Sequence, residues 1–156
     1  TPDPWTERAP VDFARRRLVI GLLLFAAAFT TAYWVVWFTD RSLVASSTDK
    51  AYESFENAFP VADGWLALCC VLAARALVRR TPSALLWLLC AGSAGLYLAG
   101  MDVLYDLENG IWWDGGSGGL VELGINVITV AGSLLALVLA WRHRDALLGR
   151  PAAFQQ

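Results

Sequence analysis

Four long runs of apolar residues alternate with short polar segments along the chain. The runs cover about 18–38, 61–78, 84–105 and 120–141. Each can cross a hydrocarbon core of roughly 30 Å, because a helix rises about 1.5 Å per residue. A soluble helix keeps a polar face along its length, whereas the middle of every run here is apolar on all sides.

The pattern therefore predicts an all-α fold, an integral membrane four-helix bundle with four transmembrane helices. We expect residues 1–156 to form a single membrane domain, with outer loops at about 39–60 and 106–119. The composition favours the same class, since 57% of the residues are hydrophobic and only 17% are charged. Three arginines precede a first run that is too long for the apolar part of a secretory signal, so we expect this run to be a span.

The basic residues are segregated along the chain. Ten of the twelve Lys and Arg lie before the first run, from the end of the second run to the start of the third, or after the fourth, and only Arg41 and Lys50 lie elsewhere. Positive residues are retained on the cytoplasmic side. We therefore expect both termini to be cytoplasmic in a multi-pass cell-membrane protein. The Ala-, Arg- and Leu-rich composition is typical of a high-GC bacterium, so the expected location is a bacterial plasma membrane.

The acidic residues show the opposite distribution. Ten of the fourteen Asp and Glu fall in the outer loops or the outer ends of the runs, where they face only two basic residues. A surface with this balance attracts cations and repels anions. Nucleic acid is therefore not expected as a partner.

The first outer loop contains the segment TDKAYESFENAFP, which has helical spacing of its aromatic residues. Tyr52, Phe55 and Phe59 recur at three- and four-residue steps and would form one apolar face. We expect a short interfacial helix lying on the membrane. On that interpretation Glu56 and the neighbouring polar residues point elsewhere.

Polar residues also recur at helical spacing inside the runs. Glu122, Asn126 and Thr129 make one stripe on the fourth run, and lipid cannot satisfy such groups. Acids of the second and third runs and aromatic residues of the first fall at the same depth, near the outer membrane edge. The predicted ligand-binding residues are Tyr33, Trp37, Asp63, Asp102, Tyr105, Asp106, Glu122 and Asn126.

Clustered carboxyl groups in a low-dielectric site favour a retained proton or a bound cation. The leading prediction is therefore a pocket for a cationic or amphiphilic, lipid-like ligand, bounded by acids and aromatic faces. An enzyme of the isomerase or cyclase type would use Asp102 or Glu122 as proton donor. A divalent cation would be held by Asp102, Asp106 and Glu122, and no other cofactor is expected.

Two other function classes stay open, and so does the question of enzymatic activity. The protein could be a non-catalytic accessory subunit of a larger membrane complex, or a cation- or proton-coupled transporter. The expected partners are membrane lipids, an amphiphilic small molecule and a membrane protein. The sequence has no CxxC motif, which argues against thiol redox chemistry. It has a single histidine, His143, which argues against haem or zinc bound by several histidines.

Overall fold

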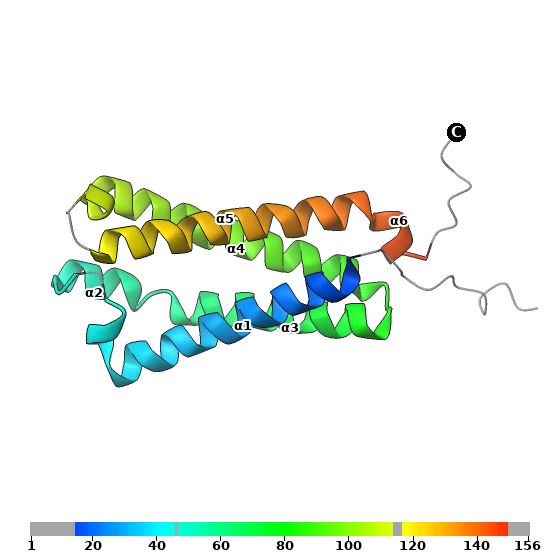
Figure 1. Cartoon of the computed structure of the whole chain (residues 1–156), viewed down its shortest axis with the longest axis horizontal. Helices are drawn as coiled ribbons and strands as arrows, with labels where there is room; N and C mark the ends of the chain where they lie inside the picture. Colours follow the sequence, from blue (N-terminus) through cyan, green and yellow to red (C-terminus); the bar gives the residue numbers. More distant parts are fainter. Residues whose placement is uncertain (1–14, 46, 114–116, 150–156) are drawn as a thin grey trace, which may run out of the picture.

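The structure is a computed structural model of the chain, and it describes residues 15–45, 47–113 and 117–149. The described residues form helices and turns without strands, and four helices are long and apolar enough to cross a membrane. This confirms the predicted all-helical fold and its four candidate spans. The long helices are α1 (Arg16–Thr39), α3 (Pro60–Arg79), α4 (Ser83–Asn109) and α5 (Ser117–Arg142) (Figure 1).

Short helical segments lie at the two ends of the bundle. The turn η1 (Arg41–Leu43) and the helix α2 (Lys50–Glu56) follow α1, and the turn η2 (Ile111–Trp113) follows α4. They gather at one end, which we call the α2 end, while α6 (Arg144–Leu147) lies at the opposite end (Figure 1). A short helix in the first loop was expected, and the structure contains it.

Helix α4 is longer than the sequence predicted. It was expected to end near residue 105, but it continues to Asn109 and stops at Gly110, whose φ of 68° is a left-handed conformation that glycine adopts easily. Asp106 therefore lies inside α4 rather than in a loop. The predicted second outer loop shrinks to 110–116, of which residues 114–116 lie outside the described part of the chain.

The long helices pack in the order α1–α3, α3–α4 and α4–α5. Helices α1 and α5 do not form a closely packed pair, and they separate toward the α2 end (Figure 1). Small residues allow the close approach of α4 and α5. A methyl group added at Gly92 would lie 2.7 Å from Cγ of Leu137, so this small-residue face of α4 is covered within the chain.

The interior has two parts of different composition. The half away from α2 contains a cluster of buried Ala, Leu, Val and Cys, with Leu77, Ala73 and Ala140 fully enclosed, and Ser133 is a buried polar residue packed against α4 beside it. The α2 end contains an aromatic cluster of Trp34, Trp37 and Tyr52.

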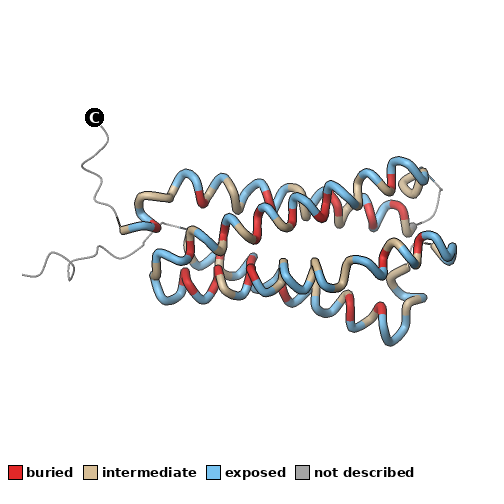
Figure 2. Tube along the Cα trace, turned by 180° about the vertical axis from the view of Figure 1, so that it is seen from behind, coloured by how far each residue is buried: buried red, intermediate tan, exposed pale blue. Residues whose placement is uncertain are grey.

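The outer surface of the bundle is apolar along its length. Phe25 is 66% exposed, Val61 86% and Ile128 71%, and exposed positions recur along every long helix (Figure 2). Lipid chains cover such a surface in a membrane protein, whereas large exposed apolar areas are rare in soluble monomers.

Candidate functional site

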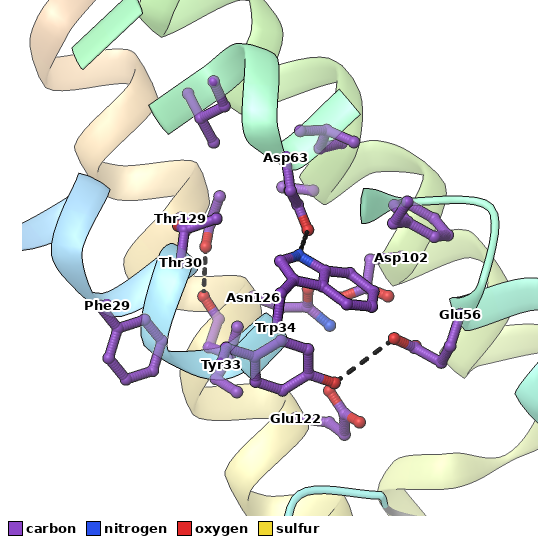
Figure 3. A pocket seen from close by; sticks show the side chains of 15 residues that line it. Phe29, Thr30, Tyr33, Trp34, Glu56, Asp63, Asp102, Glu122, Asn126 and Thr129 are labelled. Atoms are coloured by element: carbon purple, nitrogen blue, oxygen red, sulfur yellow. Dashed lines mark hydrogen bonds between the residues drawn. The ribbon is translucent and has the colours of Figure 1, made fainter. Parts of the chain in front are cut away.

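A cavity of about 110 Å³ lies between the four long helices near the α2 end. Four acids line it, and each comes from a different helix (Figure 3). They are Glu56 from α2, Asp63 from α3, Asp102 from α4 and Glu122 from α5. Carboxyl groups far apart in the sequence are therefore brought to one space.

Aromatic side chains donate hydrogen bonds to three of these acids. Trp34 Nε1 donates to Asp63 at 2.8 Å, and Tyr33 Oη donates to Glu56 at 3.4 Å (Figure 3). Both donors come from neighbouring positions on α1. On the α2 side, Tyr52 Oη donates to Glu122 Oε1 at 3.0 Å.

Asp102 differs from the other acids of the cavity. It is only partly buried, and its carboxylate has no hydrogen-bond partner among the described residues. It lies one helical turn before Asp106, so both side chains project from the same face of α4. Asp102 is therefore the carboxylate whose hydrogen-bonding capacity stays available to a ligand.

Asp106 and Asn126 form a buried pair beside the cavity. Each is 2% exposed. Asp106 Oδ2 accepts from Asn126 Nδ2 at 2.7 Å and from Trp112 Nε1 at 2.8 Å. The amide oxygen of Asn126 is buried and has no hydrogen-bond partner. One ligand oxygen from each of Asp102, Asp106 and Glu122 lies within 4.8 Å of the others.

No basic side chain lines the cavity to balance these acids. Arg41 lies outside it, where it pairs with Glu53 at 2.9 Å and covers the ring of Trp37. A second ion pair joins Arg144 to Asp145 at the opposite end. The lining of the cavity is therefore acidic, with four carboxyl groups and no basic side chain.

The structure brings together most of the predicted site residues. Tyr33, Asp63, Asp102, Glu122 and Asn126 line the cavity, and Figure 3 shows them converging from four elements. Asp106 does not line it, but contacts it through Asn126.

Trp37 and Tyr105 do not form cavity walls as predicted. Trp37 packs against Tyr52 and donates from Nε1 to Asn57 Oδ1 at 3.0 Å. Tyr105 stacks on Phe55 with ring centroids 3.9 Å apart. Both rings contact aromatic residues of α2, and neither lines the cavity.

Three contributors to the site were missed in the sequence. Trp34 was not selected, Tyr52 was placed on a lipid-facing surface, and Glu56 was expected to point elsewhere. That expectation for Glu56 is wrong, because the residue is 7% exposed and lines the cavity. The signal was available in the four-residue step from Tyr52 to Glu56, which puts both on one face of α2.

Comparisons with protein families, with curated proteins and with solved structures found no match to this chain. The interpretation of the site therefore depends on its own geometry.

Proposed function

We propose that the cavity binds the cationic head group of an amphiphilic, lipid-like ligand. The observation that carries this proposal is the convergence of four acids on one cavity whose lining includes no basic side chain. An ammonium group supplies the missing charge and can donate up to three hydrogen bonds. Tyr33 and Trp34 line the same space, and aromatic faces attract cations.

The size of the cavity limits what part of the ligand enters. At about 110 Å³ it is smaller than the about 150 Å³ of an engineered cavity that holds benzene. A small head group fits, whereas a long hydrocarbon chain does not. The chain of the ligand must therefore stay outside the cavity, in contact with lipid.

Such a ligand would enter between α1 and α5, which both border the cavity and do not form a closely packed pair. Phe29 and Thr30 of α1 and Ile125 and Thr129 of α5 line the cavity. An amphiphile entering from the bilayer would place its head group at the acids and its chain between these helices. Asp102 would then form the ion pair with the ammonium group.

We also propose that the α2 end faces the outside of the cell membrane, with both termini cytoplasmic. The supporting observation is the position of the basic residues, since Arg75, Arg79, Arg142 and Arg144 all belong to the opposite end. A cysteine at Ser54 in α2 should react with a membrane-impermeant thiol reagent added outside intact cells. A cysteine at Thr81 should react only after lysis.

This labelling needs a background in which Cys69, Cys70 and Cys90 are replaced by alanine. The reverse pattern, with Thr81→Cys labelled outside and Ser54→Cys protected, would contradict the proposed orientation.

Binding of dodecylamine to the purified protein tests the proposed ligand class. Dodecylamine carries an ammonium group at neutral pH, whereas dodecanol is neutral and dodecanoate is anionic with the same chain length. We expect saturable one-to-one binding of the amine in lipid nanodiscs containing EDTA, at least tenfold tighter than that of dodecanol. Isothermal titration calorimetry measures all three ligands.

Dodecanoate should not compete with the amine, because its carboxylate would add negative charge to an acidic cavity. Equal binding of all three ligands would show that only the hydrocarbon chain is recognised, and the proposal of a cationic head group would then fail.

Two structural observations bear on the other function classes. The small-residue face of α4 is covered by α5, so it does not supply a docking surface for the helix of a partner subunit. The buried cluster in the half away from α2 consists of apolar residues, with Ser133 as the buried polar residue beside it in the described chain, which disfavours transport of an ion through that half. A catalytic version of the site would use Asp102 as proton donor, and it requires the same binding pocket.

A further inference from the structure

We propose that Asp102, Asp106, Glu122 and Asn126 form a binding site for a hard divalent cation at the α4–α5 face of the cavity. This site goes beyond the proposed amphiphile pocket and does not depend on it. Two of its members, Asp106 and Asn126, are buried and are joined by a hydrogen bond between α4 and α5.

The spacing of the carboxylates suits one shared ion. Ca²⁺ binds oxygen ligands at about 2.3–2.6 Å, so two ligands on opposite sides of it are up to about 5 Å apart. One oxygen from each of Asp102, Asp106 and Glu122 lies within 4.8 Å of the others. Both recorded hydrogen bonds to Asp106 end on Oδ2, so Oδ1 remains for a ligand.

Asn126 supplies an independent indication of a ligand. Its side chain is 2% exposed, and its Oδ1 atom is buried without a hydrogen-bond partner. Its Nδ2 atom donates to Asp106, and its side chain lines the cavity together with Asp102 and Glu122. Buried polar atoms are normally satisfied, and an amide oxygen is a common ligand of hard cations. This oxygen would coordinate a cation at the cluster as the fourth protein ligand.

The donor set indicates the class of metal. All four ligands are oxygens, and no cysteine or histidine lines the cavity. Carboxylate and carbonyl oxygens suit Mg²⁺, Ca²⁺ and Mn²⁺, whereas softer metals prefer nitrogen and sulfur. The charge of three carboxylates further favours a divalent ion over a monovalent one.

The cation and an ammonium head group would share Asp102 and Glu122. They are therefore alternative occupants, and each should weaken the apparent binding of the other as its own concentration rises. Glu56 and Asp63 contribute to the head-group pocket without belonging to the cation site. Variants of Glu56 and Asp63 therefore test the head-group pocket, whereas variants of Asp106 and Asn126 test the cation site.

Mn²⁺ binding to the full-length protein tests the cation site. After treatment with EDTA and its removal, the protein in nanodiscs of zwitterionic lipid is titrated with Mn²⁺, and free Mn²⁺ is measured by electron paramagnetic resonance. We expect one saturable site at concentrations up to about 1 mM. Asp106→Asn and Asn126→Leu should each weaken this binding at least tenfold, and Ca²⁺ should displace Mn²⁺.

Glu108→Gln is the matched control, because Glu108 is an exposed acid on the same helix. Glu56→Gln should leave Mn²⁺ binding within twofold of the wild type while it weakens the binding of dodecylamine. No saturable Mn²⁺ binding by the wild type, or equal loss in Glu108→Gln and Asp106→Asn, would overturn the cation site.

Asn126→Asp is a control that separates the loss of a ligand from misfolding, because it is expected to increase Mn²⁺ binding. This variant keeps an oxygen at the same place and adds a fourth negative charge, so it should bind Mn²⁺ more tightly than the wild type. Its thermal unfolding temperature should also rise more steeply with Mn²⁺ concentration. Unchanged or weaker Mn²⁺ binding by a folded Asn126→Asp would contradict the proposed ligand set.

Discussion

Replacement of Tyr52 by alanine is expected to release α2 from the bundle and to destabilise the fold by about 3–5 kcal/mol, the usual cost of removing a buried aromatic ring. Tyr52 is 2% exposed, and its hydroxyl donates to Glu122 at 3.0 Å. Its ring packs against Trp37 and Tyr105. It therefore connects α2 to α1, α4 and α5, and thermal unfolding in detergent measures the loss of these contacts.

Two further tyrosine variants show whether the ring or the hydroxyl is responsible. Tyr52→Phe keeps the ring and should lose about 0.5–1.5 kcal/mol, because the hydrogen bond to Glu122 is removed. Tyr97→Ala should have little effect, since Tyr97 is 69% exposed on the outside of α4. Equal unfolding temperatures for Tyr52→Ala and Tyr97→Ala would contradict the anchoring role of Tyr52.

Asp102→Asn is expected to weaken dodecylamine binding by about 10- to 150-fold, which corresponds to about 1.5–3 kcal/mol for a charge-assisted hydrogen bond. Asparagine has nearly the same shape, so the change removes charge without creating a cavity. Asp102 forms no hydrogen bond with the described residues, so its loss leaves no donor of the protein unsatisfied. Calorimetry with the folded variant measures the loss.

Glu108→Gln is again the control for charge alone. It removes one negative charge from the same end of α4, but Glu108 is exposed and does not line the cavity. Its amine affinity should stay within twofold of the wild type. Amine binding by Asp102→Asn at the wild-type affinity would show that Asp102 does not form the ion pair.

The sequence predicts the long helices, and it predicts which acids share a helix face, because both depend on the pattern of residues within a single helix. Asp102 and Asp106 share a face because they are four residues apart, and the same holds for Glu122 and Asn126. Apolar runs of about twenty residues define where such helices lie. These features do not require knowledge of how the helices pack.

The parts that sequence reasoning missed depend on packing between elements. The inward position of Glu56 follows from α2 covering the cavity, and amphipathicity alone assigns its aromatic face to lipid. Trp37 and Tyr105 share faces with site residues of their own helices, but α2 inserts its aromatic residues beside them. The extra turn of α4 ends at Gly110, and the pattern of apolar residues does not predict this end because the turn contains polar residues.

The most direct test of the proposed pocket is to locate a bound amine. A long-chain primary amine with a photoreactive diazirine near its ammonium group is crosslinked to the protein in nanodiscs, and the labelled residues are identified by mass spectrometry. The account predicts labels on Phe29, Thr30 and Ile125, where α1 and α5 border the cavity, and their loss with excess dodecylamine. Labels confined to lipid-facing residues such as Val61 and Trp141, unaffected by dodecylamine, would contradict it.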